Sequence, residues 1–284
     1  MRTGVVATAA LCLIGASAAE QAGDEAWSLR AAKFSETGRA DANRAKAAMQ
    51  NYEAALSLEP ESVPLRFKAM EANYFYGEFV SQRDSERKRL YEQSVKLSNE
   101  VLITLRRDIS AGTDFDSLPL ADQAKLFAKA PLAAKAHFWA AINWGLWGMS
   151  HSYFASARED VAERIRHHAR LLILIDPKYA DAGGYRLLGR LHSLTPKIPL
   201  FTGWIDRKYG LKLLRKAHGI SNADPRNALF LAEAILDVNP KKRSEALNLL
   251  REVVKTVPNE YYLVEQTQTI KQATHLLNSL LAEN

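Results

Sequence analysis

The sequence GGYRLLGRLHSLTPKIPLFTGWIDRKYGLKLLRKA, residues 183–217, contains two helical patterns separated by an insertion. The first pattern has the spacing aromatic-x2-Leu-Gly-x2-aromatic, and the residues at these positions are Tyr185, Leu188, Gly189 and His192. The second pattern brings Leu211, Leu214 and Ala217 to one side of a helix. Between them, residues 195–204 are rich in proline and aromatic side chains. The stretch therefore predicts a helix hairpin with an unusually long connection.

Similar patterns on both sides of this stretch are typical of tetratricopeptide (TPR) repeats, in which each repeat is a pair of helices. The pattern Ala-x3-aromatic-x2-Ala-Leu-x-Leu-x-Pro runs from Ala48 to Pro60, and a first-helix pattern recurs within residues 136–154. Residues 108–122 interrupt the period and are predicted to form a loop. No stretch alternates long enough to require a strand. We predict an all-α array of antiparallel TPR-like helix hairpins, an α-solenoid with insertions.

The first nineteen residues have the features of a secretory signal peptide. Arg2 precedes an apolar run, and small residues follow at Ala16 and Ala18. We expect cleavage near Ala19, so that residues 1–19 are removed and residues 20–284 form a single TPR-like domain in the periplasm. The alternative is a buried first helix. Cys12 also leaves a lipid anchor open, but we favour unanchored export, because Leu11 is a large residue for a lipoprotein cleavage site.

The net charge of +6 limits the partners that the chain is expected to meet. An exported protein does not ordinarily encounter nucleic acid, so the charge does not predict a nucleic-acid interface. Anionic lipid, an acidic partner and a solvated basic surface remain as explanations, and we favour the last. No later run reaches the about 18 apolar residues that cross a bilayer. We therefore expect no transmembrane segment after signal cleavage.

The sequence lacks the short motifs of the common enzyme classes. It has no Gly-x-Ser-x-Gly elbow, no phosphate-binding loop, no His-Glu-x2-His and no cysteine pair. The seven histidines are scattered, and we interpret them as structural rather than as metal ligands. Asp206 is interpreted as a helix cap. We expect no enzymatic activity, no cofactor and no metal.

The remaining candidates are residues suited to recognition. Trp139, Asn143 and Trp147 fall four apart on one helical face, and such a stripe is either core or a binding face. A buried amide is easier to keep where it meets a ligand or water. Arg186 and Arg190 lie one turn apart and could hold a carboxylate, although a solvated basic face is the simpler interpretation.

The signal peptide, the degenerate repeats and the segments AHFWAAINWGLWG and GGYRLLGRLHSLTPKIPLFTGW together resemble the T-component family of TRAP-transporter-associated proteins, the TatT-like proteins. The resemblance extends from about residue 47 to residue 281 and is densest over residues 137–226. It implies a periplasmic helical protein that is usually lipid-anchored, can form a homotrimer pierced by a pore, and partners a substrate-binding protein. The ligand or pore-lining residues it implies are Trp139, Asn143, Trp147, Arg190, His192 and Trp204.

Two functions are compatible with these observations. The first is a non-enzymatic periplasmic protein that assists solute uptake as an accessory of a TRAP-type transporter, by binding a substrate-binding protein, a small hydrophobic or organic-acid ligand, or both. The second is a cell-envelope scaffold that binds protein segments and has no small-molecule role. An enclosed aromatic pocket would favour the first function and an open polar groove the second.

Overall fold

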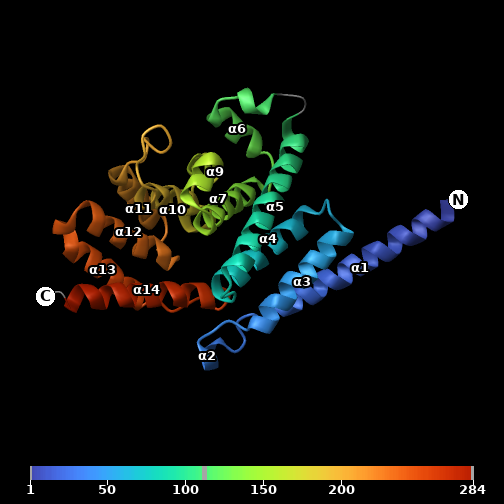
Figure 1. The fold of residues 1–284 in the computed structure, drawn as a ribbon, viewed down its shortest axis with the longest axis horizontal. Helices are drawn as coiled ribbons and strands as arrows, with labels where there is room; N and C mark the ends of the chain where they lie inside the picture. The colour runs from blue at the N-terminus through green and yellow to red at the C-terminus, as the bar shows by residue number, and fades with distance from the viewer. Residues whose placement is uncertain (1, 111–113, 283–284) are drawn as a thin grey trace. The chain divides into compact units, whose positions relative to one another are not determined.

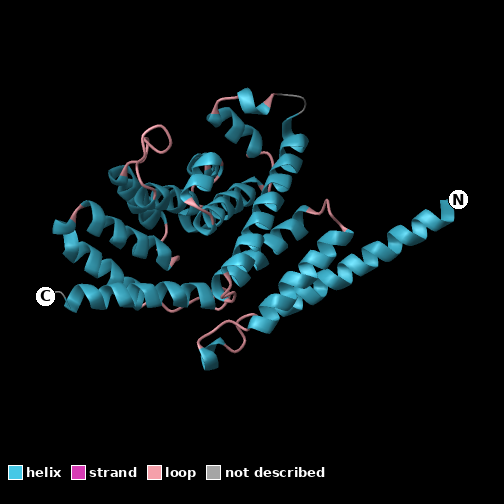
Figure 2. Ribbon diagram, viewed as in Figure 1, coloured by secondary structure: helices cyan, strands magenta, loops and turns pink. Residues whose placement is uncertain are grey.

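The computed structural model describes residues 2–110 and 114–282, with side chains from residue 15 onward except Ser35 and Ser110. Every regular element within these residues is a helix (Figure 2). The chain divides into two compact units, residues 1–101 and 102–284. Each unit is built from helices that pack on their neighbours in sequence, as predicted for an α-solenoid (Figure 1).

The first unit contains four long helices and one short one. They are α1 (Arg2–Ser28), α2 (Phe34–Thr37), α3 (Ala42–Leu58), α4 (Val63–Phe79) and the first part of α5 (Asp84–Ser110). Helix α3 packs against α1 and α4. Helices α4 and α5 form a hairpin in which the Asn73 amide donates to Ser94 Oγ at 3.3 Å. Helix α3, which contains most of the repeat pattern that begins at Ala48, packs against α1 as the second helix of a pair.

Helix α1 continues without a break through the predicted cleavage point near Ala19. The part beyond that point makes its own contacts, because Asp24 accepts hydrogen bonds from Tyr52 Oη at 2.8 Å and from Lys68 Nζ at 2.6 Å. Gly23 lets the Tyr52 ring approach, since a Cβ there would lie 2.6 Å from it. Signal cleavage and the single domain of residues 20–284 remain predictions, and the Cys12 side chain lies outside the described side chains.

The second unit begins with the end of α5. It continues through η1 (Phe115–Ser117), α6 (Leu120–Phe127), α7 (Ala133–Ser150), α8 (Tyr153–Arg158), α9 (Val161–Ile175), α10 (Tyr179–Leu194), α11 (Arg207–Ile220), α12 (Pro225–Val238), η2 (Pro240–Lys242), α13 (Arg243–Val254) and α14 (Leu263–Ala282). The predicted loop at residues 108–122 was partly wrong, because a 3-10 turn and the start of α6 lie within it. Pairs from α9·α10 to α13·α14 pack in succession.

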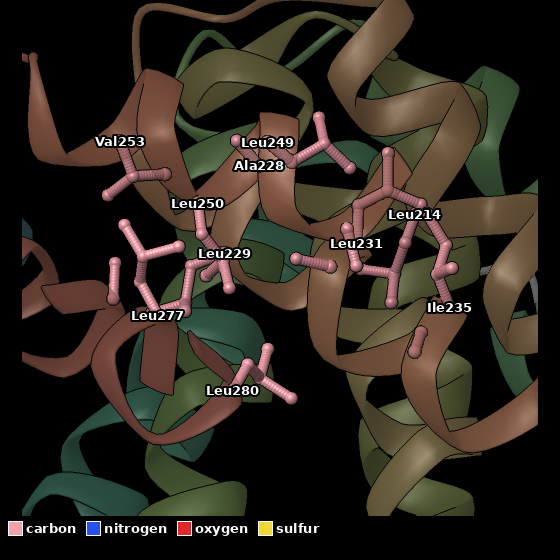
Figure 3. Packing of buried hydrophobic residues seen from close by; sticks show 14 residues of the cluster. Leu214, Ala228, Leu229, Leu231, Ile235, Leu249, Leu250, Val253, Leu277 and Leu280 are labelled. Atoms are coloured by element: carbon pink, nitrogen blue, oxygen red, sulfur yellow. The ribbon is translucent and has the colours of Figure 1, made fainter. Parts of the chain in front are cut away.

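An apolar core joins the last four helices. Leu229 of α12, Leu250 of α13 and Leu277 of α14 are buried and gather in one cluster (Figure 3). Each such side chain contributes about 1.5–3 kcal/mol when it is removed from water. The cluster makes α14 an integral part of the array.

Helices α10 and α11 approach closely through two glycines. A Cβ on Gly189 would lie 2.7 Å from Leu214 Cγ, and a Cβ on Gly210 would lie 3.0 Å from the carbonyl oxygen of Gly189. The Gly of the first-helix pattern is therefore required by packing. This close contact holds α10 and α11 together, and the insertion at residues 195–204 connects these two helices.

Helix α10 begins with a left-handed turn. Ala180, Asp181 and Ala182 have φ values of 49°, 55° and 61°, which cost about 1–2 kcal/mol for each residue with a Cβ. The Arg186 guanidinium donates to the carbonyl oxygens of Ala180 and Asp181 at 3.1 and 3.0 Å. These bonds offset part of the strain and hold the turn in place.

The same guanidinium links this turn to the start of α12. Arg186 lies 3.2 Å from the carboxylate of Asp224 and donates to Asn227 Oδ1 at 2.9 Å, and all three side chains are buried. Burial alone would raise the pKa of Asp224, but the guanidinium groups of Arg186 and Arg226 hold this pKa well below its ordinary range. The carboxylate therefore stays ionised as the buried partner of Arg186.

Candidate functional site

The end of α7 presents large apolar and aromatic side chains. Trp147 stacks on His151 with ring centroids 3.6 Å apart and planes inclined by 10°. Met149 and Phe154 are 72% and 79% exposed, and Tyr153 is 59% exposed. We call these residues the α7–α8 aromatic segment, and its members are Trp147, Met149, His151, Tyr153 and Phe154. Large exposed side chains close together in sequence are typical of a contact surface rather than of a core.

Two glycines of α7 lie where helix α9 packs against it. A Cβ on Gly148 would lie 3.0 Å from Val161 Cγ1, and a Cβ on Gly145 would lie 4.0 Å from Ile165 Cδ1. The two glycines therefore let the neighbouring helix α9 approach α7 closely. Ser152 lies beyond the end of α7 and caps α8 by accepting a hydrogen bond from the Ala155 N–H.

The other two α7 candidates differ in burial. Asn143 is fully buried, and Trp139 is half-buried with its ring 5.9 Å from that of Phe138. The adjacent Trp144 is buried and lies under the Arg164 guanidinium at 4.5 Å from the ring centroid. The predicted stripe is therefore half-buried at Trp139 and Trp147 and fully buried at Asn143 between them.

The arginines of α10 are satisfied by carboxylates of this chain. Arg190 forms an ion pair with Glu233 of α12, and its guanidinium lies 4.2 Å from the centroid of Phe230. Arg186 pairs with Asp224, as described above. Both arginines therefore hold α10 to α12. The carboxylates that they bind are those of Asp224 and Glu233, within the same chain.

His192 and Trp204 are brought together at the base of the insertion. Their ring centroids are 5.4 Å apart, and the Arg166 guanidinium lies over the Trp204 ring at 4.2 Å from its centroid. His192 Nδ1 accepts a hydrogen bond from the Asp206 N–H at 3.0 Å. Because Nδ1 accepts this bond, the ring proton lies on Nε2. Burial lowers the pKa of His192.

The insertion itself ends in an exposed tip. Leu200 is fully exposed and has a φ of 71°, and the adjacent Phe201 is 59% exposed. Asp206 caps the following helix, α11, as predicted, by accepting hydrogen bonds from the N–H groups of Lys208 and Tyr209. The tip and its support are the main features of this hairpin that the repeat pattern did not predict.

A histidine pair lies inside the second unit. The Nδ1 atoms of His137 and His168 are 3.0 Å apart, and both side chains are buried. Burial lowers the pKa of both imidazoles. Among the described residues, no three or more His, Cys, Asp or Glu side chains gather as a metal site would require.

Comparison with known proteins gives likeness at the level of structure. No protein-family model and no curated protein matches the sequence. The structure is similar to that of TTC0263, a thermophilic TPR protein of Thermus thermophilus, with a TM-score of 0.49 and 14% identity over 80% of this chain and 91% of that one. It is also similar to the TPR2AB domain of yeast Sti1 in complex with pHSP90, with a TM-score of 0.29 and 15% identity over 91% and 98%. The TPR-like architecture rests on the packing of the chain itself.

Within the described residues, no helix combines the length and the apolar character that crossing a membrane requires.

Proposed function

We propose that this chain is a non-enzymatic periplasmic scaffold that binds a partner protein through the α7–α8 aromatic segment. The observation that carries the proposal is the exposure of Met149, Tyr153 and Phe154 beside the Trp147–His151 stack. Methionine and aromatic side chains are enriched in the buried centres of protein interfaces. Helix α9 supports the segment from behind, so little ordering is needed when a partner binds.

The more specific form of the proposal is a role in solute uptake. The sequence resemblance to TatT-like proteins is densest over the residues that contain this segment, and it supports a periplasmic substrate-binding protein of a TRAP-type transporter as the partner. A small organic ligand and a homotrimer belong to the same proposal. The alternative is an envelope scaffold without a small-molecule role. Both forms place the chain in the periplasm after cleavage near Ala19, without a lipid anchor at Cys12.

The test is native mass spectrometry of the protein isolated from its own periplasm. A complex with a substrate-binding protein that is lost in the variant Met149→Ser/Phe154→Ser supports the proposal. The matched control is Val257→Ser/Tyr261→Ser, which removes two exposed apolar side chains elsewhere in the same unit and should keep the complex. Equal loss in both variants, or retention in both, contradicts the assignment of the segment.

The same spectra separate the two forms of the proposal. A trimer with a reproducible small added mass supports transport and provides the ligand for identification. A complex with a large envelope protein and no added small mass supports the scaffold form. A bare monomer with no partner contradicts both.

A further inference from the structure

The tip of the insertion is an apolar point on a convex turn. Leu200 is 101% exposed, and Phe201 follows it directly. Leu194, at the end of α10, is also 59% exposed. A residue with a Cβ rarely adopts the positive φ of Leu200, and this conformation places an apolar side chain where water surrounds it. Such an arrangement is costly in solution and indicates a contact that the isolated chain does not make.

The tip is held in a defined shape. Thr202 Oγ1 donates to the carbonyl oxygen of Pro196 at 2.6 Å and accepts from the Ile198 N–H at 2.9 Å. Below it, Ile205 is buried against α9 and α10, and Trp204 packs on the same core. The exposure of Leu200 and Phe201 is therefore a property of an ordered loop, and little conformational entropy would be lost when the tip is buried.

Basic residues surround the tip in the sequence. Residues 195–220 contain six basic residues and one acidic residue, Asp206. Lys197 and Lys208 flank the tip and are exposed, and no ion pair within the described part of the chain engages either of them. Arg207, between Asp206 and Lys208, pairs with Asp237. The segment therefore combines apolar side chains at its tip with positive charge at its base.

We infer that the tip at Leu200 and Phe201 inserts into the surface of an anionic lipid bilayer, with Lys197 and Lys208 at the headgroups. Apolar side chains that enter the interface, backed by lysines that meet anionic lipid, are the two components of peripheral membrane binding. A convex tip is suited to a fluid surface that closes around it, whereas a protein partner would have to supply a matching cavity. This contact is separate from the α7–α8 aromatic segment and does not depend on the proposed function.

The test measures binding to vesicles and the environment of the tip together. The full chain in a Cys12→Ser background is mixed with phosphatidylcholine vesicles, with or without about one-third phosphatidylglycerol, which supplies the anionic surface. The variants are Leu200→Ser/Phe201→Ser and Lys197→Glu/Lys208→Glu, and the control is Val257→Ser/Tyr261→Ser. A further variant, Phe201→Cys, carries an environment-sensitive dye at the tip. Circular dichroism verifies that each variant is folded.

The tip variant is expected to bind anionic vesicles about a hundredfold more weakly, because it removes two side chains that are each worth about tenfold or more when buried. The lysine variant, which reverses two charges worth about fivefold or more each, should lower the partition coefficient about 25-fold or more. The control should match the parent chain, and the dye emission should shift to the blue on anionic vesicles. Because all the variants retain the apolar residues 5–16, any binding by these residues cancels when a variant is compared with the control.

The inference is overturned if the tip variant and the control bind anionic vesicles equally, or if the dye emission does not change on them. A dye shift that periplasmic protein produces and vesicles do not would assign the tip to a protein partner. Binding that does not distinguish the two kinds of vesicle would also overturn the headgroup contact of the lysines.

Discussion

The buried pair of His137 and His168 makes the stability of the second unit depend on pH. Burial holds the pKa of His137 well below its ordinary value, and it lowers that of His168 to about 3. The positive charges of His167 and Arg106 act in the same direction. In the unfolded chain, an imidazole takes up its proton near pH 6.5. Folding therefore requires both groups to stay neutral below that pH.

The magnitude follows from proton linkage. Between pH 6.5 and about 3 the unfolded state binds more protons than the folded state, so the free energy of unfolding falls as the pH falls. Above pH 6.5 the contribution is fully present. Each buried imidazole costs about 1.4 kcal/mol per pH unit within this window, which is about 2 kcal/mol at pH 5. The two together should remove about 4 kcal/mol between pH 7.5 and pH 5.

The assay is urea unfolding at these two pH values, followed by tryptophan fluorescence. Four of the five tryptophans lie in residues 102–284, so the signal chiefly reports the second unit. His168→Gln keeps a polar partner for His137 but cannot titrate, and it should lose only about 2 kcal/mol over the same interval. The control His275→Gln changes an exposed histidine and should behave as the parent chain does.

Equal pH dependence in the parent chain and in His168→Gln would refute this reasoning, whatever the stability of the variant at pH 7.5. It would mean that the imidazoles are accessible to protons in the folded state. A smaller pH dependence in His275→Gln would mean that the measured loss comes from the surface.

Three further predictions concern stability, each measured by urea unfolding at pH 7.5. Asp224→Asn should cost about 3–5 kcal/mol, because it leaves the buried Arg186 charge without its counterion, whereas Asp237→Asn in an exposed pair should cost less than about 1 kcal/mol; similar costs would contradict the buried network. Gly189→Ala should cost about 1–3 kcal/mol by forcing α10 and α11 apart, and a neutral result would mean that the hairpin is loosely packed. Ala180→Gly should stabilise by up to about 1 kcal/mol by relieving the left-handed turn, and a loss would show that the turn is not strained.

The fold could largely be predicted from the sequence, because repeat signatures record contacts between neighbouring helices. Gly189 occupies its position since any side chain would strike Leu214, and that requirement appears directly in the spacing. The left-handed turn at residues 180–182 could not be predicted. It carries no glycine, and it depends on Arg186, which lies in the next turns of the same helix, and on Asn227, which comes from a distant part of the chain.

The candidate site could be predicted only in part. The cap at Asp206 was predicted from short-range sequence, whereas the contact of His192 with Trp204 was not. Asn143 is enclosed, and Arg190 is engaged by Glu233, and neither fact can be read from helical periodicity. The sequence does not show which side chains are buried, because burial depends on which helix covers each face of another helix. The exposed tip at Leu200 could have been found as two large apolar residues within a proline-rich insertion.

The glycine contact between α10 and α11 makes the packing of the two helices independent of the segment that connects them. Because Gly189 and Gly210 fix the two helices against each other and Trp204 packs on the core, residues 195–203 need not hold the helices together. This segment can therefore change in length and composition while the hairpin keeps its geometry. The two helices therefore form a fixed support, and the residues at the tip can be replaced without any change in the packing of the core.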